Sequence, residues 1–253
     1  VESKNVVARL EGTEAADEVT LYLAHWDHLG TQEGVEGDDV FNGAHDNATG
    51  TAGLIELARA FSRLDPKPRR SVVFLAVTAE EQGLLGSRFY ARNPLYPVAK
   101  TVAAINMDGA NVWGRTRDVT VVGMGQSNLD DLARRFAAEQ ERVVVPDTEP
   151  QKGFYYRSDH FELAKVGIPS FYANPGVDFP GKPEGWGQRE RERYVAEDYH
   201  KPSDEMKEWW DLSGMVEDLE LFFAMGRHLA TSDEWPEWSE TSEFRAVRQA
   251  SRE

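Results

Sequence analysis

The stretch VTLYLAHWDH, residues 19–28, runs from apolar side chains directly into a group of ionisable ones. Its apolar part, Val19 to Ala24, has the composition and length of a largely buried strand. The same pattern recurs at four other places in the chain: Ser71–Val77, Thr101–Met107, Val119–Val122 and Pro169–Ala173. These five runs predict the strands of a central sheet.

Apolar residues at helical spacing lie between the predicted strands. The segments 52–64, 128–141 and 212–229 each place such residues on one face. In the first segment this face would hold Leu54, Ile55, Ala58 and Phe61. Strands that alternate with helices predict an α/β fold with a mostly parallel sheet. The length of 253 residues suits one large domain, so we expect a single domain over residues 1–253.

Two parts of the chain lack such periodicity. The segment 174–202 contains prolines, glycines and a charged run from Arg189 to Arg193, and it predicts a long irregular loop. The C-terminal tail, residues 232–253, is polar with scattered aromatic residues. We expect the tail to pack back onto the domain.

Composition excludes several classes of protein. A formal net charge of -16 argues against nucleic-acid binding, which needs clustered Lys and Arg. No segment approaches the roughly 20 apolar residues that span a bilayer. The chain has no cysteine, so any metal must be held by nitrogen and oxygen. Because it opens at Val1 without a signal-type segment, we expect a trimmed form of a longer precursor.

Polar motifs follow the predicted strands, at the edge where open α/β sheets bind ligands. His25 ends the first strand and offers an imidazole nitrogen to a metal, while Asp27 can accept the other ring proton. The alternative is a strand-end histidine in a hydrogen-bonded turn. In GAHDNATG, Asp46 can bridge two cations or simply cap the following helix.

Further acids end two other predicted strands. In TAEEQG, Glu80 and Glu81 are neighbours, and their mutual repulsion at a buried strand end needs cations or protonation to offset it. A solvated helix N-terminus is the alternative. Asp108 in NMDG is a ligand or a turn former, and His200 beside Tyr199 is a further candidate ligand.

Together the motifs supply a donor set for two zinc ions: His25, Asp46, Glu81, Asp108 and His200. Imidazole and carboxylate are ligands that zinc accepts, and Glu80 is left as a general base. Two Zn²⁺ bring a charge of +4 and the three carboxylates bring -3. The remaining positive charge can stabilise a bound hydroxide.

Five motifs occur in the order AHWDHLG, GAHDNATG, TAEEQGLLGS, NMDG and DYHKPSDE, with RSDHFELAKVGIPSF between the last two. In these motifs the chain resembles the bacterial zinc aminopeptidase family, whose relatives include glutamate carboxypeptidase, plasma glutamate carboxypeptidase and the transferrin receptor. The resemblance extends from Asn5 to about Leu229. It implies a three-layer α/β/α sandwich with a mixed, mostly parallel central sheet.

The resemblance also implies a role for each ligand. His25 and Asp108 would hold one zinc, and Glu81 and His200 would hold the other. Asp46 and a water or hydroxide would bridge the two ions. In this family a cis peptide bond often follows the residue that matches Asp46.

Two more residues gain expected roles from the resemblance. Asp27 would orient the ligand His25, and Tyr199 would polarise the scissile carbonyl. Many relatives carry a protease-associated domain and a secretion signal, which this sequence lacks. The resemblance therefore implies a catalytic portion alone, from a periplasmic or secreted protein.

The predicted reaction is hydrolysis of the N-terminal bond of a peptide substrate by a metal-bridging hydroxide, with Glu80 as general base. Side-chain specificity is expected from six aromatic residues: Phe154, Tyr155, Tyr156, Phe161, Phe179 and Trp186. A carboxypeptidase or dipeptidase of the same superfamily is an alternative, and it would grip a terminal carboxylate with basic residues such as Arg157, Arg189, Arg191 or Arg193. A glutaminyl cyclase or a non-enzymatic receptor-like module fits less well, because the ligands and the base are all present.

Overall fold

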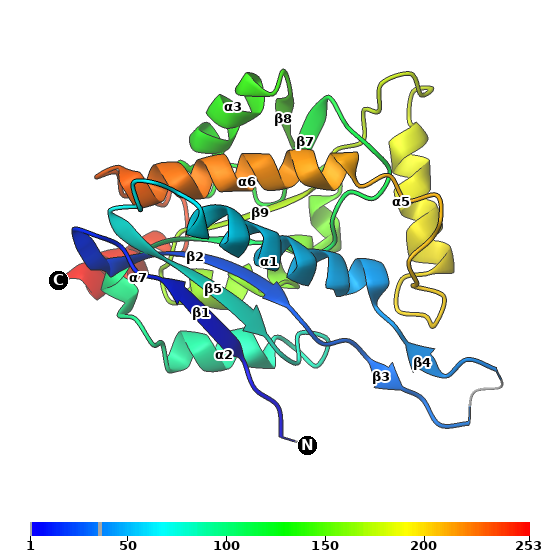
Figure 1. Cartoon of the computed structure of the whole chain (residues 1–253), viewed down its shortest axis with the longest axis horizontal. Coiled ribbons are helices and arrows are strands. Elements are labelled where there is room, and N and C mark those ends of the chain that lie inside the picture. Colours follow the sequence, from blue (N-terminus) through cyan, green and yellow to red (C-terminus); the bar gives the residue numbers. More distant parts are fainter. Residues whose placement is uncertain (1, 35–36) are drawn as a thin grey trace.

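A seven-stranded sheet forms the centre of the computed structural model, which describes residues 2–34 and 37–253 (Figure 1). The predicted domain, 1–253, also includes Val1 and residues 35–36, which lie outside the described part. The sheet has the order β1-β5-β2-β6-β9-β7-β8. Its strands are β1 Val6–Leu10, β2 Ala15–His25, β5 Arg70–Val77, β6 Thr101–Asn106, β7 Asp118–Val121, β8 Val143–Pro146 and β9 Ser170–Pro175.

The central strands are parallel and the outer strands make the sheet mixed. β2 pairs in parallel with β5 and with β6, and β6 pairs in parallel with β9. β1 runs antiparallel to β5, and β7 runs antiparallel to β9. A short hairpin, β3 Gly30–Thr31 and β4 Val40–Phe41, projects from the body of the molecule (Figure 1).

Side chains of β2 alternate between two apolar layers, because successive residues of a strand point to opposite faces. Tyr22 and Ala24 pack into one cluster, and Leu21 and Leu23 pack into the other. Helices α1 Thr49–Ser62, α3 Leu129–Glu139 and α6 Ser213–Thr231 cover the first face. Helices α2 Leu85–Arg92 and α4 His160–Lys165 cover the second. This arrangement confirms the predicted three-layer α/β/α sandwich.

All five predicted strands and all three predicted helices are present, with ends shifted by a few residues. The strands β1 and β8 were not predicted, since both are short and partly exposed. One predicted core residue is wrong. Ile55 is 56% exposed, and Leu57 takes its place in the buried face of α1.

The prediction of an irregular loop over 174–202 is wrong. β9 continues to Pro175, and helix α5 spans Trp186–Glu197. The charged run in α5 hides the helix in the sequence because the helix has almost no apolar face. The tail packs onto the domain through buried Trp238 and ends in α7 Arg245–Arg252. Among the described helices, none has the length and apolar character needed to cross a membrane.

The close approach of α6 to β2 depends on Gly226. A Cβ atom at this position would overlap the hydroxyl of Tyr22, which donates a hydrogen bond of 2.7 Å to the Phe222 carbonyl. We expect Gly226→Ala to lower the free energy of unfolding by about 1–3 kcal/mol, although alanine favours a helix. In urea unfolding, the double variant with Tyr22→Leu should lose less than the sum of the two single losses. Additive losses would contradict this packing.

His160, the first residue of α4, is fully buried between Tyr155 and Tyr172, with ring centroids 4.8 and 4.9 Å away. Burial lowers the pKa of His160 to about 3. As the pH falls below about 6.5, the unfolded chain therefore binds a proton at His160, whereas the imidazole in the folded chain stays neutral.

We expect the free energy of unfolding to fall with pH between about 6.5 and 3, with a contribution from His160 of up to about 1.4 kcal/mol per pH unit. His160→Phe should remove that contribution. Urea unfolding of both proteins at several pH values measures the difference. Parallel pH curves would show that the buried ring does not cause the loss.

Candidate metal centre

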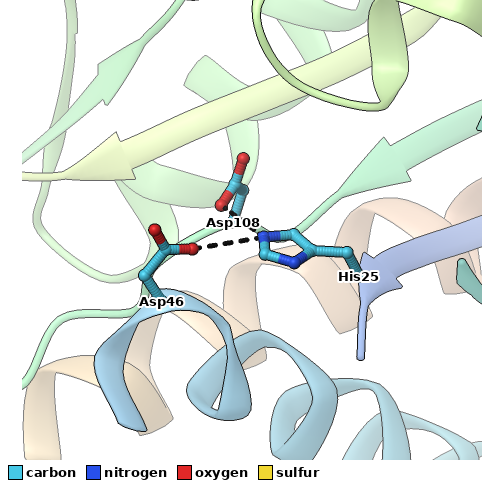
Figure 2. Close-up of side chains that lie close together, drawn as sticks. All are labelled: His25, Asp46 and Asp108. Atoms are coloured by element: carbon cyan, nitrogen blue, oxygen red, sulfur yellow. Dashed lines mark hydrogen bonds and ion pairs between the residues drawn. The ribbon is translucent and has the colours of Figure 1, made fainter. Parts of the chain in front are cut away.

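The carboxyl ends of three parallel strands bring the predicted site together. His25 is the last residue of β2, Glu80 and Glu81 follow β5, and Asp108 follows β6. Parallel neighbours end at the same edge of the sheet, so these side chains meet there. Asp46 approaches from the turn before α1, as Figure 2 shows for its meeting with His25 and Asp108.

Asp46 lies between two groups of ligands. One oxygen, Oδ1, lies 3.2 Å from Nε2 of His25, which is also 3.3 Å from Oδ1 of Asp108. The other oxygen, Oδ2, lies 3.3 Å from Nε2 of His200, which is also 3.0 Å from Oε2 of Glu81. The structure thus brings all five predicted ligands together, with one oxygen of Asp46 facing each group.

The spacing of these atoms fits tetrahedral zinc. Zinc bonds to nitrogen and oxygen of about 2.0–2.1 Å place neighbouring ligand atoms about 3.3 Å apart, close to the distances found here. Nε2 of His200 is buried and makes no hydrogen bond within the described residues, although two carboxylate oxygens lie near it. A nitrogen close to two carboxylate oxygens, without a hydrogen bond to either, is the arrangement expected of donors that converge on an ion. The donor set fits one zinc ion in each group.

Carboxylates and imidazoles perturb each other in this cluster. Burial alone would lower the pKa of His25, but Asp108 and Asp46 overcome it and hold that pKa well above its usual range. Contacts with Asp46 and Glu81 raise the pKa of His200 to about 10. Protons on the imidazoles thus balance the carboxylates, and a bound cation would replace them.

Glu80 directly precedes Glu81 in the chain and is only 9% exposed. Burial raises the pKa of Glu80 to about 9, and the nearby charge of Asp108 adds to the shift. Cations in the cluster act in the opposite direction and favour the carboxylate. A buried carboxylate next to the ligands is suited to accept a proton.

The expected contact between the Asp27 carboxylate and His25 differs from the one in the structure. Nδ1 of His25 lies 3.0 Å from the main-chain carbonyl of Asp27. The Asp27 carboxylate instead accepts a 2.7 Å hydrogen bond from the Ala79 amide, directly before Glu80. Asp27 therefore supports the ligand through its backbone and the predicted base through its side chain.

Tyr199 and His200 form a stacked pair, with ring centroids 3.8 Å apart. The tyrosine therefore lies directly beside the last predicted ligand. Three of the six predicted specificity residues lie in the core. Tyr155 and Phe179 are buried, and Phe161 packs against the same aromatic cluster as Tyr155, so these three are core residues and not pocket walls.

Asn47 was not singled out by sequence, although it follows a predicted ligand. Its Oδ1 accepts hydrogen bonds of 3.0 Å from the amides of Gly50 and Gly109. Its Nδ2 donates to the carbonyls of Met107 and His25. Asn47, and not Asp46, thus accepts a hydrogen bond from the first turn of the following helix. The peptide bond between Asp46 and Asn47 is cis, as the resemblance implies.

Asp204 and Ser158 also support ligands and were not predicted. The Asp204 carboxylate is buried and accepts hydrogen bonds from the amides of His45, at 2.9 Å, and Asp46, at 3.0 Å. Ser158 donates a 2.5 Å hydrogen bond to Oδ2 of Asp108. Both residues lie in motifs that the sequence displays, but neither residue type points to this role by itself.

The chain is thus a three-layer α/β/α domain with a candidate metal centre of imidazoles and carboxylates at the carboxyl edge of its sheet. Over residues 5–223 the chain matches Peptidase family M28, and it belongs to that family. A probable zinc metalloprotease of Pyricularia oryzae is 41% identical over 98 residues, 36% of this chain and 18% of the relative. A probable zinc metalloprotease of Pyrenophora teres f. teres is 38% identical over 104 residues, 41% of this chain and 22% of the relative.

Solved structures share the fold at low identity. The zinc aminopeptidase BSAP from Bacillus subtilis has a TM-score of 0.65 and 21% identity, over 95% of this chain and 52% of that one. The LapA aminopeptidase of Legionella pneumophila has a TM-score of 0.64 and 19% identity, over 91% and 55%. A glutaminyl cyclase from an Acidobacteriales bacterium has a TM-score of 0.59 and 16% identity, over 89% and 73%. The chain thus spans about half the length of these two aminopeptidases.

Asp204 gives a test of how the centre is supported. The Asp204 carboxylate accepts hydrogen bonds from two backbone amides. In Asp204→Asn the side-chain NH₂ group would face one of these amides and could not accept its hydrogen bond. We expect zinc binding to weaken by about 10- to 100-fold, as is typical when an outer partner of a ligand is lost. Competition with a chromophoric chelator measures the affinity. Glu205→Gln, at the exposed neighbour, is the matched control, and equal affinities in the two variants would contradict the prediction.

Proposed function

We propose that this chain is the catalytic domain of a zinc-dependent aminopeptidase that holds two zinc ions and removes N-terminal residues from peptides. The family supports peptide hydrolysis, and the names of the relatives support zinc. The observation that carries the proposal is the division of Asp46 between two ligand groups, with the buried Glu80 next to Glu81 in the chain.

Each residue has a part in the proposed reaction. His25, Asp108, Glu81 and His200 would hold the ions, with Asp46 shared between them. Bound zinc supplies Lewis acidity at this edge of the sheet, which makes water more acidic and a carbonyl more electrophilic.

Glu80 would take a proton from the attacking water and pass it to the leaving amine. Its carboxylate is not one of the ligand atoms described above, so it stays available for this transfer. Tyr199, which stacks on His200, would donate a hydrogen bond to the scissile carbonyl. Burial raises the pKa of Tyr199, which keeps the phenol protonated as a donor.

A free amino terminus suits the carboxylate oxygens at this edge. They would accept hydrogen bonds from the amino group of a substrate. Two of the four arginines considered for a carboxypeptidase are already engaged. Arg193 pairs with Glu190, and Arg189 donates to the carbonyl of Glu184. Arg157 and Arg191 remain for the alternative.

Glu80 and its neighbour Glu81 provide a matched pair of variants. Glu80→Gln should retain zinc and lose activity by about 10²- to 10⁴-fold, because it removes proton transfer but no ligand. Glu81→Gln should lose zinc as well as activity. Metal content and hydrolysis of aminoacyl chromogenic substrates are measured together for both variants and the wild type.

The substrate panel includes N-blocked versions of the same compounds. An aminopeptidase cleaves only the compounds with a free amine. Equal cleavage of the blocked compounds would favour the carboxypeptidase or endopeptidase reading. A Glu80→Gln protein that loses zinc as Glu81→Gln does would place Glu80 among the ligands and overturn its role as base.

A further inference from the structure

His28 lies beside the metal centre, but none of the roles described above uses it. It follows His25 by three residues, in the segment after β2, and its side chain is 7% exposed. Nδ1 of His28 is 2.8 Å from Oε1 of Glu81. The ligand atoms of His28, Glu81 and Asp46 all lie within 4.8 Å of one another.

The contact between His28 and Glu81 does not have the geometry of a hydrogen bond. Within the described residues, neither ring nitrogen of His28 nor Oε1 of Glu81 has a hydrogen-bond partner. His228 and Glu234 are also 2.8 Å apart, and they do form a hydrogen bond. Nδ1 and Oε1 are therefore close without pointing at each other, which is the arrangement of two donors that converge on an ion.

Glu81 lies between two imidazoles. Oε1 faces His28, and Oε2 lies 3.0 Å from Nε2 of His200. The two rings are 5.6 Å apart and inclined by 71°, so they approach the carboxylate from different sides. Nε2 of His200 has the same unpartnered geometry as Nδ1 of His28.

Backbone packing holds the His28 ring in place. A Cβ atom at Gly43 would lie 2.6 Å from Cγ of His28, so only glycine lets the segment that carries Asp46 pack on this ring. Gly43 also has a φ of 60°, which glycine adopts readily. The segment before Asp46 and the His28 ring are thus fixed against each other.

We propose that His28 is a third imidazole ligand of this centre and binds the second ion together with His200, Glu81 and Asp46. The inference rests on the proposed two-zinc centre and adds a ligand to it. The second ion would then have four protein donors, and the first would have three: His25, Asp108 and Asp46.

This difference in the number of protein ligands would give the two ions different roles. Zinc with four protein ligands is typical of a closed, structural site, whereas three ligands leave a position for water or substrate. The first ion would therefore carry the open position, near Glu80. The second ion would be held more tightly and would fix Glu81 and Asp46.

The test compares wild type, His28→Ala, His28→Asn and a control, His228→Ala, which removes a hydrogen-bonded histidine elsewhere. Zinc affinity is measured by chelator competition, and the number of imidazoles per zinc by X-ray absorption. We expect wild type to bind two zincs with three imidazoles between them. Both His28 variants should lose affinity for one zinc by more than about 100-fold, beyond the loss caused by removing an outer partner.

Asparagine separates ligation from orientation, because it keeps an N–H donor for Glu81 but is a poor zinc ligand. Wild-type zinc affinity in His28→Asn, or an unchanged imidazole number in His28→Ala, would overturn the proposal. Free imidazole should restore the second zinc to His28→Ala. Thermal unfolding of the zinc-free proteins checks that the variants fold.

Two other results separate this inference from the proposed function. Wild type that binds fewer than two zincs would overturn both the two-zinc centre and the role of His28. Wild type that binds two zincs with three imidazoles but cleaves no peptide would overturn the aminopeptidase proposal and support His28 as a ligand.

Discussion

The side-chain amide of Asn47 is the constraint on which the metal centre depends. With four hydrogen bonds it joins the end of β2, the segment after β6 and the first turn of α1. The first two segments carry His25 and Asp108, and Asp46 directly precedes Asn47 in the chain. Because Asn47 is 2% exposed, water cannot replace these bonds without opening the core. One amide thus sets the distances between ligands that are far apart in the sequence.

Groups close to each carboxylate offset the electrostatic cost of the centre. Several carboxylates lie at one buried edge of the sheet, and each would be unfavourable there alone. The Asp204 carboxylate accepts hydrogen bonds from two backbone amides, and the Asp108 carboxylate accepts one from the hydroxyl of Ser158. Imidazole protons balance the remaining charge until a cation takes their place. The polar surroundings of the ligands are therefore as much a part of the site as the ligands.

The sequence predicts those parts of the molecule that depend on continuous apolar runs or on obligatory donor types. The central strands and three long helices have such runs, and the five proposed ligands are histidines and acids, three of them at strand ends. Helix α5 was missed because charged residues surround it, and β1 was missed because an edge strand is only half buried. Asn47 and Asp204 accept hydrogen bonds from backbone amides near the site. Such contacts depend on the path of the backbone, which residue type alone does not predict.

The proposed ligands also span a large part of the chain, from His25 to His200. A metal ion held between them would join the N-terminal and C-terminal parts of a protein that has no cysteine. Such a link acts as a cross-link: it closes a long loop and removes conformations from the unfolded chain. It can form only after β2, β5, β6 and the segment after α5 have met, so the ion would be captured late in folding and would then hold the finished domain closed.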